Sequence, residues 1–294
     1  MPECKVGDPP ARVIACVNQK GGTGKSATAT NLGIGLVQHG KKTLIIDCDS
    51  QASQTISLGW PQPDELPVTL ATLLSSQMER RQCDPREAIL HHAEGVDLLP
   101  SSIELFGLEL RMVNAMSRET MLKRLVDQLR PGYDFIVLDC PPTLGMITIN
   151  ALAAADSVIV PVQPEYLSVI GMTQLFDTVA QVQQQINPGL QVEGVLITLA
   201  NMRTNLARNS VDIIRNAYGG NATGGSVSHI RIYSEPIPLS VKIKEASAAG
   251  KSIFAHESGG KAAMAYECLV REVLCDARER RTDISTARKA KSER

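Results

Sequence analysis

The chain has 294 residues, which suits one large α/β domain or two small ones. Hydrophobic residues make up 43% of it, enough for a full core, whereas a 3% aromatic content argues against a surface that stacks nucleic-acid bases. The formal net charge is −1, so any binding to nucleic acid has to come from a local basic patch. No apolar run approaches the length of a membrane span, and polar residues 1–10 do not have the pattern of a signal peptide.

The first elements in chain order are a flexible leader over residues 1–11, an apolar strand at 13–17 and a helix at 27–36 that ends before Gly40. A glycine-rich loop joins that strand to that helix. Further along, periodicity and turn residues predict strands at 41–47, 96–100, 133–139, 157–162, 192–199 and 227–232. They predict helices at 68–75, 85–92, 103–130, 143–155, 170–186, 209–217 and 258–277, with Ser258 a candidate cap.

The helical pattern over residues 103–130 carries the clearest set of apolar positions: Leu105, Leu108, Met112, Met116, Leu122, Leu125 and Leu129. Residues 219–225 hold four glycines and predict a flexible turn. Residues 278–294 are charged and lack apolar periodicity, so we expect them to be disordered. The seven cysteines have no metal-ribbon or redox spacing, which favours reduced thiols in the core.

Strands alternate with helices throughout, which indicates an α/β fold with a predominantly parallel, twisted sheet covered by helices on both faces. We expect residues 12–277 to form a single domain. Ligands of such sheets bind outside the carboxyl ends of the strands. Lys20, Asp47, Asp49 and Asp139 all fall at or just past predicted strand ends, so they share one rim of the sheet.

The loop over residues 18–26 reads Asn-Gln-Lys-Gly-Gly-Thr-Gly-Lys-Ser. Its glycines let the backbone curl so that successive N–H groups point into one concavity, and the following helix start adds free N–H groups. Lys25 supplies an ammonium group for the outer phosphates of a nucleotide, and Ser26 a hydroxyl for Mg²⁺. The alternative is a glycine-rich turn with two solvated lysines.

This loop departs from the standard phosphate-binding pattern, which has a glycine where Gln19 stands. A second lysine, Lys20, opens the loop instead. Lys20 comes too early to serve phosphates bound by its own loop, yet it lies on the phosphate side. That position suits a residue that reaches into the nucleotide site of a facing subunit.

With this second lysine, residues 20–26 resemble the deviant Walker A loop of the ParA/MinD family of dimerising P-loop ATPases. Residues 44–51, 139–145, 160–166 and 237–250 are similar to the ParA (Soj-like) branch, in the family's order and spread over residues 12–275. The resemblance implies a P-loop NTPase fold with ATP and Mg²⁺ as cofactors.

The same resemblance implies roles for individual residues. The nucleotide phosphates are expected on Lys20, Gly21, Gly22, Thr23, Gly24, Lys25, Ser26 and Ala27. Ser26 is expected to bind Mg²⁺ directly, and Asp47 and Asp139 to hold it through water. Adenine contacts are expected from Asn201, Ile237 and Pro238.

Catalysis of hydrolysis is expected from Asp49, which would orient the attacking water, from Lys25 in the same subunit and from Lys20 across the dimer. Asp49 could instead only cap the next helix. Both alternatives remain open at the level of sequence.

A basic cluster resembles the segment with which relatives bind DNA without sequence preference, and its candidate contacts are Arg203, Lys242 and Lys244. The chain departs from the family here, because Leu239 stands in place of an arginine. The alternative is a solvated charged surface.

The function implied by the resemblance is that of a cytoplasmic, nucleoid-associated ATPase. It forms an ATP-dependent homodimer, binds non-specific DNA and partitions a DNA element with a ParB-like partner that stimulates hydrolysis. A MinD-like membrane-cycling ATPase needs a C-terminal amphipathic helix, and Ile284 is the only large apolar residue of 278–294, so we expect no membrane binding. A scaffold that recruits another protein is a third hypothesis.

Overall fold

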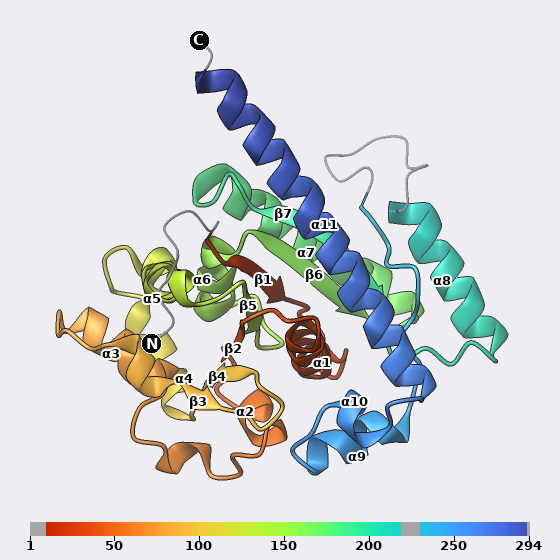
Figure 1. Ribbon diagram of the computed structural model, residues 1–294, viewed down its shortest axis with the longest axis horizontal. Coiled ribbons are helices and arrows are strands. Elements are labelled where there is room, and N and C mark those ends of the chain that lie inside the picture. Colours follow the sequence, from red (N-terminus) through yellow and green to blue (C-terminus); the bar gives the residue numbers. More distant parts are fainter. Residues whose placement is uncertain (1–9, 219–229, 293–294) are drawn as a thin grey trace.

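A seven-stranded sheet forms the centre of the chain in a computed structural model that describes residues 10–218 and 230–292 (Figure 1). The strands are β1 (Arg12–Cys16), β2 (Thr43–Asp47), β3 (Leu90–His91), β4 (Asp97–Leu99), β5 (Phe135–Asp139), β6 (Ser157–Val162) and β7 (Gln191–Ile197). Their order across the sheet is β3-β4-β2-β5-β1-β6-β7, and only the β3–β4 pair is antiparallel. The predicted fold class is therefore confirmed.

Helices cover both faces of this sheet. The longer ones are α1 (Lys25–Gln38), α3 (Leu70–Met78), α4 (Glu104–Met112), α5 (Met121–Leu129), α6 (Met146–Ala154), α7 (Tyr166–Gln185), α8 (Asn205–Tyr218), α9 (Val241–Ala248) and α11 (Lys261–Ser292). Two short ones are α2 (Ser53–Ser57) and α10 (Ile253–His256). No helix in the described ranges is both long and apolar enough to cross a membrane.

Side chains alternate between the two faces, as the pleat of a strand requires. In β1, Ile14 and Cys16 pack in a core with α1, α9, α10 and α11. Val13 and Ala15 pack in a second core with α3, α4, α5, α6, α7 and α8. Both faces of the central strands are therefore buried, and the carboxyl ends of the parallel strands remain as the place for a ligand.

The predicted helix over residues 103–130 is two helices, α4 and α5. The chain leaves the helical path between them, where Ser117 takes a left-handed backbone conformation with φ 52°. Met116 was predicted to face the core, and this is wrong, because it is 92% exposed. The sequence analysis missed this break because the helical spacing of apolar residues continues across it and no proline or glycine lies there.

Other boundaries also differ from the predictions. Residues 85–92 form a 3₁₀ turn (Pro85–Ala88) followed by β3, because Leu90 pairs with Leu98 of β4. Of the strand predicted at 227–232, Ile232 makes one isolated bridge to Val195, and residues 227–229 lie outside the described part. The glycine-rich turn at 219–225 and leader residues 1–9 also lie outside it. Helix α11 begins at Lys261 and continues through Ser292, where we expected disorder.

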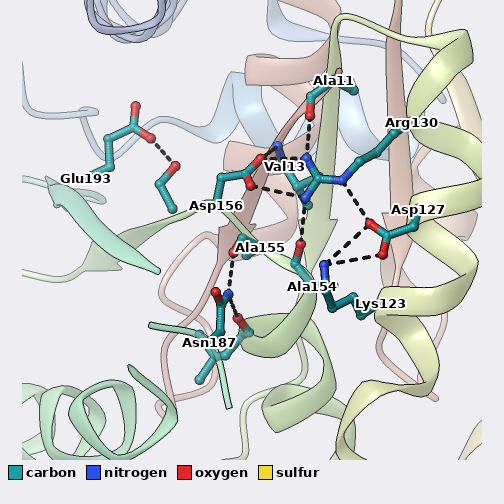
Figure 2. Close-up of polar contacts among 12 residues, drawn as sticks. Ala11, Val13, Lys123, Asp127, Arg130, Ala154, Ala155, Asp156, Asn187 and Glu193 are labelled. Carbon is teal, nitrogen blue, oxygen red and sulfur yellow. Dashed lines mark hydrogen bonds and ion pairs between the residues drawn. The ribbon is translucent and has the colours of Figure 1, made fainter. Parts of the chain in front are cut away.

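Arg130, which follows α5, holds the amino-terminal end of β1 in place (Figure 2). Its guanidinium donates to the carbonyls of Ala11 (2.8 Å) and Ala154 (3.2 Å) and to both carboxylate oxygens of Asp156 (3.0 and 3.1 Å). Asp156 in turn accepts the N–H of Val13 at 2.7 Å. This network fixes where β1 starts beside β6, and so it fixes the strand whose far end carries the glycine-rich loop.

Candidate nucleotide and magnesium site

The glycine-rich loop connects β1 to α1, and two of its glycines have conformations that other residues rarely adopt. Gly22 has φ 72°, and Gly24, the residue before α1, has φ 81°. The first helical hydrogen bond of α1 runs from Thr28 N–H to Gly24 C=O (2.8 Å). The N–H groups before it have no partner within the helix, so this turn can bind an anion.

Neighbouring strand ends hold the loop by its carbonyl groups. Gln163, just past β6, donates to the carbonyl of Gly22, and Thr198, just past β7, donates to that of Thr23, both at 2.7 Å. Asn18 donates to the carbonyl of Pro161 at 2.7 Å. The loop is therefore preorganised by bonds to its C=O groups. Sequence reasoning gave no role to Gln163 or Thr198, although residue 163 lies in a stretch used for the resemblance, and it named Asn18 only as part of the loop.

Lys25 lies in the mouth of this loop. Only 7% of it is exposed, and its amino group is 3.3 Å from the carbonyl oxygen of Lys20. Burial lowers the pKa of Lys25, and the charge of Asp139 opposes that shift. A buried ammonium group with one carbonyl partner leaves hydrogen-bonding capacity for a phosphate.

Two buried carboxylates lie opposite each other at the ends of β2 and β5, where Asp47 is in register with Asp139. Asp47 accepts the N–H (2.8 Å) and the hydroxyl (2.7 Å) of Thr55. Burial raises the pKa of Asp47 to about 6, although these hydrogen bonds act against the rise. The sequence analysis assigned no role to Thr55, which lies in the short helix α2.

One carboxylate oxygen of Asp139 lacks a hydrogen-bond partner in the described part of the chain. Its Oδ1 is buried and accepts no hydrogen bond from the described residues. Burial, and then the charge of Asp47, raise the pKa of Asp139, while the hydroxyl of Ser26 and the charge of Lys25 act in the opposite direction. A hydrated divalent cation would supply both the missing donor and the missing positive charge. The residues present therefore fit Mg²⁺.

Asp49 follows β2 at the same rim and is half-buried. Its Oδ1 accepts the N–H of Gln51 at 3.0 Å, a local turn, and in the described part of the chain its Oδ2 has no hydrogen-bond partner. The residue that precedes α2 as its cap is Ala52. Asp49 therefore does not cap that helix with its side chain, and one oxygen stays available for a water molecule.

Lys20 is paired within its own chain. Its amino group lies 2.5 Å from the carboxylate of Glu165, which follows β6, and both side chains are about half exposed. An exposed pair of this kind contributes about 0–1 kcal/mol, so it can open. Glu165 had no predicted role.

Beyond the end of β7, a cavity of about 830 Å³ is lined by Asn201 and Pro238, two of the predicted adenine contacts. Ile237 does not line it, because the side chain is 1% exposed and lies in the core. The backbone of Ile237 bonds to Ile197 (2.8 Å) and Ala200 (3.0 Å) instead. The side chain of Ile237 therefore faces the core and not this cavity, and a contact of Ile237 with adenine stays a prediction.

The three residues predicted to contact DNA are all exposed. Lys242 is paired with Glu245 at 2.9 Å, which raises the pKa of Lys242. Lys244 and Arg203 form no ion pair with another described residue. The basic cluster is thus partly neutralised by Glu245, which the sequence pattern did not anticipate.

Comparison with known proteins identifies this arrangement. A family model described as an AAA domain matches residues 11–192. The sporulation initiation inhibitor protein Soj of Bacillus subtilis is 37% identical over 265 residues, which are 90% of this chain and 99% of Soj. The chromosome partitioning protein ParA of Myxococcus xanthus is 34% identical over 90% of this chain and 88% of ParA.

Among solved structures, cobyrinic acid a,c-diamide synthase of Mycobacterium smegmatis with bound ADP and magnesium has a TM-score of 0.76 and 33% identity, covering 90% of this chain and 94% of that one. The cell division ATPase MinD of Pyrococcus furiosus has a TM-score of 0.69 at 22% identity, covering 90% and 98%, and shares the fold. Fold and site define a P-loop nucleotide-binding protein of the deviant Walker A type. The chain belongs to the ParA/Soj family of partition ATPases, which confirms the resemblance predicted from the sequence.

Proposed function

We propose that this chain is a Mg²⁺-dependent ATPase that dimerises on ATP, binds DNA without sequence preference and positions a DNA element with a ParB-like partner. The observation that carries the nucleotide part is the pairing of Asp47 and Asp139 beside the loop that holds Lys25. Two buried carboxylates with raised pKa beside a buried lysine at a phosphate-binding loop are typical of a functional site, and phosphate with a bound cation would compensate their charges.

In this proposal the loop N–H groups and Lys25 bind the phosphates, and Ser26, Asp47 and Asp139 would hold Mg²⁺, Ser26 directly and the two aspartates through water. The bound cation would neutralise negative charge on the phosphate oxygens. Asp49 accepts a hydrogen bond from the attacking water with its free carboxylate oxygen. Asn201 and Pro238 contact adenine in the cavity beyond β7.

The dimer part of the proposal rests on Lys20. The side chain of Lys20 is half exposed at the phosphate rim, and among the described residues its amino group pairs with Glu165 alone. The amino group can therefore swing away from Glu165 and reach a phosphate bound by a facing subunit. A positive charge supplied this way completes the site only in the dimer. The cytoplasm and the nucleoid are the proposed location.

Lys20→Gln is expected to bind ATP and to lower turnover on the order of 10³-fold, the scale of a positive charge supplied in trans. Dimers should also be weaker, as measured by light scattering with ATP. Glu165→Gln is the matched control: it removes the same ion pair but keeps the lysine, so it should dimerise at least as well as the parent. Normal turnover of Lys20→Gln by a monomer would reject the role in trans.

DNA binding is proposed to switch on by assembly. The net charge is near zero, so one chain should bind weakly, and two basic patches on one rigid dimer bind with an avidity that neither has alone. Lysine and arginine on phosphates carry no base information, so sequence preference should be slight.

The double variant Lys242→Glu, Lys244→Glu should lose DNA binding but keep ATP-dependent dimers. Each DNA phosphate that the variant no longer neutralises should make the log–log salt dependence shallower by about 0.9. Lys42→Glu serves as the control, because it changes an exposed lysine just before β2, at the opposite end of the strands from the nucleotide site. Undiminished DNA binding would reject Lys242 and Lys244 as DNA contacts and make residues 278–294 the better candidate.

Co-sedimentation with DNA or with liposomes, with and without ATP, tests the proposed function against a membrane-cycling one. ATP-dependent pelleting with DNA alone is the expected result. Pelleting with liposomes alone would replace the proposal.

A further inference from the structure

Four of the exposed large apolar residues of the described chain gather on one helix, far in sequence from the DNA patch. Ile103, Phe106, Leu110 and Val113 are 53%, 58%, 63% and 51% exposed, and we call them the α4 stripe. Ile103 and Val113 flank α4 and share its helical backbone. At 100° per residue, the four side chains lie within about 80° of one another on the helix.

The opposite side of α4 is occupied. Leu105, Leu108 and Met112 are fully buried in the core beneath the sheet. The helix is therefore anchored by one apolar face and presents a second one to solvent. A single exposed leucine needs no explanation, but an ordered stripe of four large side chains marks an interaction surface.

A hollow of about 470 Å³ lies at the C-terminal end of α4, where Arg111 and residues 114–117 line it, and we call it the arginine hollow. Its lining includes Arg80, Arg111, Arg124 and Met116, the last of which is 92% exposed. Arg111 lies on α4 itself, and its guanidinium donates to the hydroxyl of Ser75 at 3.3 Å.

The three arginines of the hollow have no carboxylate partner among the described residues. Two carboxylates close to them in sequence pair with other arginines: Glu79 with Arg81 (3.0 Å) and Glu119 with Arg118 (3.0 Å). The surface thus combines an apolar stripe with unneutralised guanidinium groups, which bind carboxylates in a bidentate manner.

From this combination we propose that the α4 stripe and the arginine hollow form a docking surface for an acidic amphipathic helix of another protein. Such a helix lays its apolar face along the stripe and its carboxylates on the arginines. DNA fits less well, because the stripe offers nothing to a phosphate backbone. A bilayer fits less well, because it is flat and cannot fill a hollow.

The docking surface is also connected to the nucleotide site. Glu109 of α4 accepts the N–H of Ile147, in the first turn of α6, at 3.2 Å, and its carboxylate lies against Gly145. Residues 141–145 join that turn to Asp139. A shift of this segment with bound nucleotide would move α4, so docking and ATP binding should affect each other equally. This coupling rests on the proposed function, whereas the docking surface does not.

The test uses a fluorescein-labelled peptide of about 18 residues, five turns of helix, with Leu and Phe on one face and Glu on the other. Anisotropy titration of the full chain without nucleotide should give a dissociation constant in the micromolar range. A peptide with Lys in place of every Glu should bind at least tenfold more weakly. Failure of the acidic peptide to bind, or equal binding of both peptides, would overturn the proposal.

Two surface variants separate the parts of the docking surface. Phe106→Ser with Leu110→Ser, and Arg111→Glu with Arg124→Glu, should each weaken the acidic peptide at least tenfold. Ile213→Ser with Arg215→Glu, exposed on α8, is the matched control and should bind like the parent. Circular dichroism melts check that each variant is folded. Peptide binding that neither docking-surface variant weakens would overturn the proposal.

Competing occupants are tested with the same variants. Binding to phosphatidylglycerol vesicles, or self-association in light scattering, that both docking-surface variants abolish would assign the surface to a membrane or to a second copy and overturn the proposal. Repeating the titration with ATP and Mg²⁺ tests the coupling alone: an unchanged dissociation constant removes the coupling and leaves the docking surface.

Discussion

Replacing Lys25 with alanine is expected to abolish tight ATP binding. The side chain is buried in the mouth of the glycine-rich loop, with one carbonyl partner in its own chain. Removing one partner of a buried charged pair costs about 2–5 kcal/mol, which weakens binding roughly 30-fold to several thousandfold. Isothermal titration calorimetry with ATP and Mg²⁺ measures the loss.

The stability of the variant gives a second readout. Burial lowers the pKa of Lys25 more than the charge of Asp139 raises it, so burying the ammonium group destabilises the protein without nucleotide. Lys25→Ala should therefore melt no lower than the parent when ATP is absent. Lys42→Ala, at the opposite end of the strands from the nucleotide site, is the control and should leave the affinity for ATP unchanged. Tight ATP binding by Lys25→Ala would show that this loop is not the nucleotide site.

Asp49→Ala is expected to bind ATP normally, to assemble, and to hydrolyse about 100-fold more slowly or worse. Its carboxylate is half-buried at the rim and has one oxygen without a partner among the described residues, and positioned general bases contribute about 10²–10⁴-fold to such reactions. Binding contacts come from other residues, so the affinity for ATP should stay within about threefold. Steady-state turnover and nucleotide titration separate the two effects.

Asp49→Asn is the matched variant, because an amide oxygen still accepts the N–H of Gln51 and keeps the local turn. It should lose turnover as fully as alanine does. If only the alanine variant lost turnover, the turn and not the carboxylate would be what hydrolysis needs. Normal turnover in both would move the catalytic role to another residue.

Local patterns were sufficient for the elements that position the site. The strand at residues 157–162 was predicted with its observed bounds, and the three aspartates fall at the predicted rim. Continuous apolar runs bounded by turn residues define buried parallel strands well. The carboxyl ends of β2, β5 and β6 fell at the predicted residues, and the aspartates followed from that, whereas β7 ends two residues earlier than predicted.

Contacts between individual side chains could not be predicted in the same way. No sequence pattern predicts the hydrogen bond from Thr55 to Asp47. The same holds for the ion pairs of Lys20 with Glu165 and of Lys242 with Glu245. Ile237 was assigned to the adenine site by motif, but its side chain points into the core. These outcomes depend on side-chain direction and on partners far along the chain, which a linear pattern does not contain.

The most direct test of the account is one DNA titration with the slow-hydrolysing Asp49→Ala variant. A fluorescent duplex of random sequence is titrated with ATP, with ADP and without nucleotide, each with Mg²⁺. The account predicts tight binding with ATP alone, and loss of that binding when Lys20→Gln is added to the variant. Equal affinity in all three conditions would contradict it, because DNA binding would then need neither the γ-phosphate nor assembly.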